Sequence, residues 1–255
     1  MDALNALQAE IRACRRCLEE GYWIAPGPVL SGGAGAQVML LGQAPGPTEA
    51  VVKRPFNAGS GRRLFQWLGE AGWDEADFRA NAYMTAVTKC YPGRSGNGKG
   101  DRVPSPFEQA LCRPWLESEI RLINPRLLIL VGGLAIKLLY PPSVKLDEII
   151  GTGLYFPPEA LAADPLNFDL SQAEIIRTTD HRPQTTKDKR EMADGGQPAV
   201  VNGLWSVVHR SLRGRYVVPL PHPSGASLWP NKPENRALID RAIALLRQIR
   251  EAERL

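Results

Sequence analysis

The chain is poor in the residues that carry covalent cross-links and metal chemistry. Its 255 residues include four cysteines and three histidines. It also lacks long apolar runs: the longest, Leu127–Gly133, falls well short of the ~18 residues that a membrane span needs, so we expect no membrane partner. No apolar signal segment precedes Cys14. We therefore expect a reducing, cytoplasmic compartment, which disfavours two disulfides as the reading of the four cysteines.

The remaining composition is that of an ordinary globular protein. Apolar residues make up 44% of the chain and charged residues 23%, which is enough to bury a sizeable core. The net charge of +4 is compatible with a polyanionic partner without requiring one. Twenty-two prolines and 24 glycines indicate long ordered loops.

The spacing of the cysteines predicts a metal centre. Cys14 and Cys17 form a C-x-x-C pair, and Cys90 and Cys112 supply two more thiols far downstream. Such an arrangement can wrap a tetrahedral ion or a cubic cluster. Spacing alone leaves zinc and an iron–sulfur cluster open, because both accept four thiolates. Unpaired buried thiols are the structural alternative.

Hydrophobic patterning predicts an α/β fold. Four apolar strands are expected at residues 37–42, 81–89, 126–132 and 216–220. Helices are expected at residues 2–20, 61–72, 106–123, 134–140 and 235–253. Strands that alternate with helices of this length predict three α/β/α layers around a mostly parallel four-stranded sheet.

A long segment separates the third and fourth expected strands. We interpret residues 1–255 as a single domain with an insertion at about 150–210. Within it, residues 177–198 are polar and have no apolar period, so we expect a surface loop there.

Unusual residues follow each expected strand. The turn Gln43-Ala44-Pro45-Gly46 follows the first, and a Pro-His-Pro-Ser sequence containing His222 and Ser224 follows the fourth. Open α/β sheets bind ligands at the carboxyl ends of their strands. A histidine held between two prolines can donate to a developing anion there, although a lone histidine is more often structural.

These motifs, taken in order, resemble the family-4 uracil-DNA glycosylases, the iron–sulfur members of their superfamily. The resemblance rests on the four cysteines and on the sequences GQAPGPTEA (42–50), RPFNAGSG (54–61), YMTAVTKC (83–90), CRPWL (112–116), LLILVGG (127–133) and HPS (222–224). It covers about residues 10–140 and 215–250 and leaves out the insertion.

The resemblance implies a role for each matching residue. Cys14, Cys17, Cys90 and Cys112 would hold a structural [4Fe-4S] cluster, with zinc as the less favoured metal. The turn Gln43 to Gly46 would meet the base and deoxyribose. Glu49 would position water, Phe56 would stack on the flipped base and His222 would steady the leaving pyrimidine anion.

Two departures from the family pattern concern the base pocket. Gln43 stands where relatives commonly have glutamate, and Ala86 stands where they have the asparagine that reads uracil. A methyl group cannot supply the paired donor and acceptor that separate uracil from cytosine. Asn57 is a candidate for a compensating amide. The loop at 91–105 lacks the histidine with which some relatives form a covalent adduct with DNA.

The sequence therefore predicts a monofunctional DNA glycosylase that hydrolyses the N-glycosidic bond of a deaminated base, uracil first, and leaves an abasic site. The expected partner is DNA containing a damaged base, bound by a monomer. Two alternatives remain: a glycosylase with altered specificity for hypoxanthine or xanthine, and a non-catalytic iron–sulfur protein that binds nucleic acid. Ala86 and Gln43 favour the alternatives, whereas Glu49, Phe56 and His222 favour the enzyme.

Overall fold

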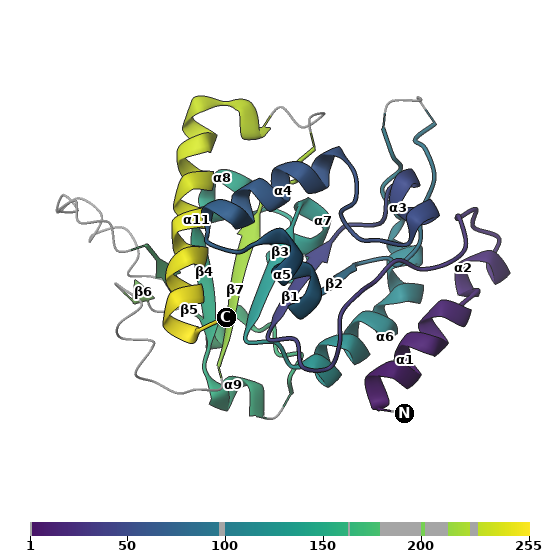
Figure 1. Cartoon of the computed structure of the whole chain (residues 1–255), viewed down its shortest axis with the longest axis horizontal. Coiled ribbons are helices and arrows are strands. Elements are labelled where there is room, and N and C mark those ends of the chain that lie inside the picture. Colours follow the sequence, from purple (N-terminus) through teal and green to yellow (C-terminus); the bar gives the residue numbers. More distant parts are fainter. Residues whose placement is uncertain (1, 97–99, 163, 179–199, 202–213, 225–228) are drawn as a thin grey trace.

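The computed structural model describes residues 2–96, 100–162, 164–178, 200–201, 214–224 and 229–255. These residues build a seven-stranded sheet in the order β2-β1-β3-β7-β4-β5-β6 (Figure 1). Its strands are β1 (Val38–Gly42), β2 (Tyr83–Ala86), β3 (Leu127–Val131), β4 (Thr152–Phe156), β5 (Glu174–Arg177), β6 (Val200–Val201) and β7 (Arg215–Leu220).

The four strands expected from the sequence form the parallel half of this sheet. β1 pairs with β2 and β3, and β3 pairs with β7, all in parallel. Every residue of these four strands is buried, which is typical of a parallel sheet covered on both faces. Their carboxyl ends therefore meet at one edge of the sheet.

The prediction of a four-stranded sheet was wrong, because the sheet has seven strands. β4 pairs antiparallel with both β7 and β5, and β5 pairs in parallel with β6, so the segment interpreted as an insertion extends the same sheet. The short strand β4 contains Gly153, where a Cβ would lie 3.0 Å from Leu245 Cδ2 and 3.1 Å from the carbonyl oxygen of Val217. A glycine required by close packing weakened the strand pattern in the sequence. The polar loop expected at 177–198 lies almost entirely outside the described residues.

Helices cover the sheet. They are α1 (Ala3–Ala13), α2 (Arg16–Glu19), α3 (Pro47–Val52), α4 (Gly59–Glu70), α5 (Glu75–Asn81), α6 (Pro106–Ile123), α7 (Gly133–Ile136), α8 (Leu146–Ile149), α9 (Pro158–Ala162) and α11 (Pro233–Glu253), with 3-10 turns η1 (Leu170–Gln172) and η2 (Trp229–Asn231). α11 packs on β7 and β4 and contacts α4, while α6 packs against α1 and α2. Figure 1 shows α4 and α11 in front of the strands, with α6 and α1 beside β2. In the described ranges, no helix is long and apolar enough to cross a membrane.

The helix expected at residues 2–20 is divided in two. α1 ends at Ala13, the next residue Cys14 has an extended backbone (φ −60°, ψ 134°), and α2 starts at Arg16. The break separates the two cysteines of the C-x-x-C pair, so Cys14 lies at the end of one helix and Cys17 lies inside the next. This turn of the chain gives the two thiols different directions of approach to a shared centre.

Candidate functional site

A pocket opens at the carboxyl ends of the four parallel strands. It contains seven of the residues predicted for the base site, namely Gln43, Ala44, Pro45, Glu49, Phe56, Ala86 and His222. Residues without a predicted role complete its wall, namely Val29, Gly42, Pro55, Ser60, Thr85 and Val131. The fold thus brings together segments that are as much as 193 residues apart in the sequence, from Val29 to His222.

Glu49 is tied to the backbone on both sides of the pocket. Its Oε2 accepts the backbone N–H of Gly46 at 2.6 Å, and its Oε1 accepts that of Asn57 at 3.3 Å. The side chain is 8% exposed. One carboxylate therefore links the turn after β1 to the loop that carries Phe56, and its position is fixed by both bonds.

Phe56 lines the pocket and lies against the end of β1. A Cβ at Gly42 would lie 2.9 Å from Phe56 Cζ, so glycine at this position makes room for the ring. Phe56 has a positive φ of 51°, which is uncommon for a residue other than glycine, asparagine or aspartate. The aromatic ring is therefore presented by a strained backbone.

Ala86 contributes a buried methyl group to the pocket wall, at the end of β2. Its carbonyl oxygen accepts a bond from Lys89 Nζ at 2.7 Å, and the same amine pairs with Glu119 Oε2 at 2.7 Å. Tyr83 and Thr85 hydroxyl groups donate to Glu119 from β2. A buried polar network thus attaches the end of β2 to α6, and the sequence reading missed it.

His222 lies exposed at the rim of the pocket and is held by its own loop. Ser224 is not among the lining residues, but its backbone N–H donates to His222 Nδ1 at 3.2 Å. Because Nδ1 accepts this bond, the neutral ring carries its proton on Nε2. Surrounding protein atoms lower the pKa of His222 by desolvation, and the charge of Asp101 partly opposes that shift.

Asp101 is a carboxylate near the pocket that the sequence reading did not identify. A Cβ at Gly46 would lie 3.3 Å from Glu49 Oε2 and 3.7 Å from Asp101 Oδ2, so both carboxylates approach the same turn. The hydroxyl group of Tyr91 donates to Asp101 Oδ1 at 3.0 Å. Asp101 lies in the loop between Cys90 and Cys112, outside the sequence motifs that identified the other site residues.

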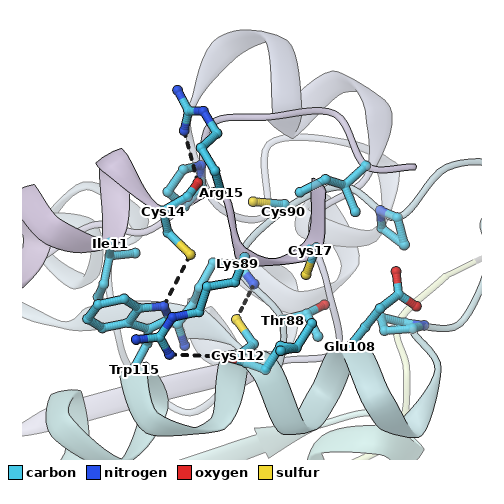
Figure 2. A pocket seen from close by; sticks show the side chains of 16 residues that line it. Ile11, Cys14, Arg15, Cys17, Thr88, Lys89, Cys90, Glu108, Cys112 and Trp115 are labelled. Carbon is cyan, nitrogen blue, oxygen red and sulfur yellow. Dashed lines mark hydrogen bonds between the residues drawn. The ribbon is translucent and has the colours of Figure 1, made fainter. Parts of the chain in front are cut away.

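The four cysteines line a second pocket, as Figure 2 shows. All four are free thiols of intermediate exposure. Two N–H groups point at their sulfurs: Trp115 Nε1 lies 3.3 Å from Cys14 Sγ, and the backbone nitrogen of Lys89 lies 3.4 Å from Cys112 Sγ. Such N–H···S bonds are typical of the surroundings of thiolate-bound metal groups.

Burial, and secondarily the proximity of the other thiols, makes these thiols hard to ionise without a cation. Desolvation, followed by the charge of Cys112, raises the pKa of Cys17 to about 11. The same causes raise the pKa of Cys90 to about 12, and desolvation also raises that of Cys112. A bound cationic group would remove this penalty, so the donor set fits a thiolate-ligated metal group.

The four thiols form a candidate ligand set for one metal group. Among the described residues, no three His, Cys, Asp or Glu side chains are arranged to hold one metal ion. Around one zinc ion, thiolate sulfurs lie within about 4 Å of one another, because each Zn–S bond is about 2.3 Å long. Four thiols that share one pocket supply the ligand set of either one tetrahedral ion or a cubic cluster.

Comparison with known proteins gives a consistent set of matches. The profile of the Uracil DNA glycosylase superfamily matches residues 31–247. The chain is 30% identical to the type-4 uracil-DNA glycosylase of Sulfurisphaera tokodaii over 137 residues, 52% of this chain and 56% of that protein. It is 28% identical to the type-4 enzyme of Saccharolobus solfataricus over 156 residues, 58% and 65% of the two chains.

A second subclass matches as well. The chain is 32% identical to the type-5 uracil-DNA glycosylase of Mycobacterium tuberculosis over 160 residues, which is 52% of this chain and 57% of that protein. In each comparison the match spans less than two thirds of the relative's own length.

Proposed function

This chain belongs to the uracil DNA glycosylase superfamily, and from that premise we propose that it is a monofunctional DNA glycosylase acting on a deaminated base. The observation that carries the proposal is the convergence of Phe56, Glu49 and His222 on one pocket at the strand ends. Substrate would be DNA whose damaged nucleotide leaves the stack, since the glycosidic carbon is out of reach inside a duplex.

In this mechanism some pocket residues bind the base and the sugar, and others stabilise the developing charge and position water. Phe56 stacks on the extruded base, and the turn from Gln43 to Gly46 contacts base and sugar. As the N-glycosidic bond breaks, its electron pair moves onto the base, where the Nε2–H of His222 donates to the developing anion. Glu49, fixed by two backbone N–H groups, orients the water that adds to the sugar carbon.

The buried lysine that follows β2 supports hydrolysis by water over attack by an amine. Lys89 is 2% exposed and is bound to Glu119 and to the Ala86 carbonyl oxygen. An amine engaged in this way is not free to form a Schiff base with the sugar. No lysine is among the described residues that line the pocket, which favours a product that is an abasic site with an intact strand.

A [4Fe-4S] cluster is the proposed metal group of the cysteine pocket. The four converging thiols and the two N–H···S bonds support a thiolate-bound metal group. The likeness to the type-4 relatives favours a cluster over zinc. When bound, such a cluster would act as a structural cross-link between α1, α2, α6 and the segment after β2.

A second candidate function concerns the choice of base. The buried methyl of Ala86 lies on the pocket wall at the position that resembles the uracil-reading asparagine. This favours either slow excision of uracil or excision of several deaminated bases, including hypoxanthine and xanthine.

Oligonucleotides that carry uracil, hypoxanthine or xanthine, followed by alkaline cleavage of abasic sites, test the proposal. We expect cluster-loaded protein to excise at least one of these bases. His222→Ala and Glu49→Gln should each lower the rate by about 100-fold or more. If the cluster-loaded wild-type protein releases none of these bases, the glycosylase hypothesis is rejected in favour of a non-catalytic nucleic-acid-binding role.

A further inference from the structure

The loop that presents Phe56 is held from outside the pocket. The carbonyl oxygen of Phe56 lies so close to α4 that a Cβ at Gly61 would be 1.9 Å away. Combined with the positive φ of 51° at Phe56, this contact defines a conformation that a bulky residue does not adopt unaided. Other groups must therefore stabilise it.

Arg79 on α5 supplies that stabilisation. Its Nη1 donates to the carbonyl oxygen of Pro55 at 2.9 Å, and its Nη2 donates to that of Phe56 at 2.9 Å. A planar guanidinium fork can bind two successive carbonyl groups at once, whereas the single ammonium of lysine cannot match this geometry.

The guanidinium group is itself immobilised. Arg79 Nε pairs with Glu75 Oε1 at 2.8 Å, and its Cζ lies 4.1 Å from the centroid of the Phe65 ring. The arginine side chain is 10% exposed, whereas that of Glu75 is 51% exposed. The Arg79 guanidinium is therefore a largely buried clamp, and its ion pair with Glu75 lies at the surface.

We propose that Arg79 is a positioning residue of the glycosylase reaction: its two bonds to the Pro55 and Phe56 carbonyl groups preorganise the ring of Phe56 for stacking on the extruded base. Arg79 is not among the residues that line the pocket and acts only through the loop. The inference rests on the proposed function, because stacking matters only if a base is bound there. A loop that is free to relax would displace the ring and slow excision without removing any group from the pocket.

A double-mutant cycle tests this assignment by single-turnover excision with Arg79→Ala, Phe56→Ala and the double variant. A misplacement of about 1 Å can cost up to ~100-fold in rate, so Arg79→Ala should slow excision by about 10- to 100-fold. In the Phe56→Ala background the same change should have little further effect, because no ring remains to be positioned. Arg79→Lys should recover part of the loss. Glu75→Ala removes the surface ion pair but leaves both carbonyl bonds and the contact with Phe65, and should cost far less than Arg79→Ala.

The proposal is overturned if Arg79→Ala excises at the wild-type rate, or if its full loss persists in the Phe56→Ala background. A wild-type protein that excises no base would instead reject the proposed function. The contribution of the Arg79 clamp to stability can then still be measured by thermal unfolding of Arg79→Ala, Phe56→Gly and their combination. Glycine adopts a positive φ without help, so Arg79→Ala should lower Tm less in the Phe56→Gly background. Equal losses of Tm in both backgrounds would exclude the clamp.

Discussion

At the scale of single residues, Ala86 is the proposed determinant of base choice. Its methyl group supplies no hydrogen-bond donor or acceptor at the proposed base-reading position of the pocket. Each hydrogen bond lost in this way typically costs about 1–3 kcal/mol of discrimination. We therefore expect weak discrimination between deaminated bases in the wild-type protein.

Ala86→Asn should raise uracil excision relative to the other bases, because its amide can pair with the edge of uracil. Ala86→Leu is the matched control, since it fills similar space without polar atoms and should not raise the rate. The measurement is the ratio of single-turnover rates on uracil, hypoxanthine and xanthine. Rapid, exclusive uracil excision by the wild type, with no effect of Ala86→Asn, would show that another group reads the base; Asn57 would be examined first.

His222 should titrate below its ordinary pKa. Desolvation favours the neutral imidazole, and the negative charge of Asp101 raises the pKa part of the way back. The unfolded chain binds this proton more readily than the folded protein does. The residue therefore favours the folded state above its ordinary pKa of about 6.5, and that contribution is lost as the pH falls through the lowered value.

Following the imidazole signals by NMR as a function of pH checks this prediction. The pKa of His222 should lie below 6.5 and should fall further in Asp101→Asn. Asp77→Asn, which removes an exposed carboxylate near the start of β1, should leave the value unchanged. A pKa that stays constant or rises in Asp101→Asn would contradict the electrostatic coupling.

At the scale of elements, the ion pair between Lys89 and Glu119 joins the end of β2 to α6. Both side chains are almost fully buried, at 2% and 0% exposure. Glu119 also accepts bonds from the hydroxyl groups of Tyr83 and Thr85. A buried pair of this kind is costly to break from one side, because the remaining charge stays buried without a partner.

Glu119→Gln should lower the free energy of unfolding by about 3–5 kcal/mol. The matched control is Glu117→Gln on the same helix, where the pair with Arg113 is partly exposed and should contribute less than about 1 kcal/mol. Urea unfolding of metal-loaded protein measures both values. Equal, small effects would mean that water or rearrangement compensates for the buried charge.

At the scale of the whole molecule, the cysteine pocket connects the N-terminal helices to the sheet. Cys14 directly follows α1, and Cys17 lies in α2. Cys90 lies after β2, and Cys112 lies in α6. A group bound by all four would hold together segments that are almost 100 residues apart in the chain. Loss of one ligand should therefore affect the entire fold.

Purified protein should be brown and contain iron and acid-labile sulfide. Cys90→Ser should lose the colour and unfold at a lower temperature, since metal binding contributes to folding free energy. Metal analysis and thermal unfolding of the two proteins are the measurements. One equivalent of zinc in a colourless protein would refute the cluster while leaving a metal cross-link.

Much of the architecture could be read from the sequence because it depends on local patterns. Buried runs such as Leu127–Val131 specify parallel strands, and the capping box of Ser105 and Glu108 with Pro106 fixes the start of α6. The short strands β4 and β5 were missed, because their pairing with β7 and with each other decides their conformation. Whether residues 150–210 are an insertion relative to other members of the family stays a prediction, as do the monomeric state and the cytoplasmic location.

The sequence by itself determined the parallel strands, the turns that follow them and the set of four thiols, because each is encoded by neighbouring residues. Only the tertiary structure decided that Asp101 approaches the turn at Gly46, that Arg79 binds the carbonyl groups around Phe56 and that Glu119 pairs with Lys89. These contacts join residues that are distant in the sequence, and no local spacing marks them. They exist because folding places the helices and the long loop against the strand ends, where distance rather than order along the chain sets the interaction.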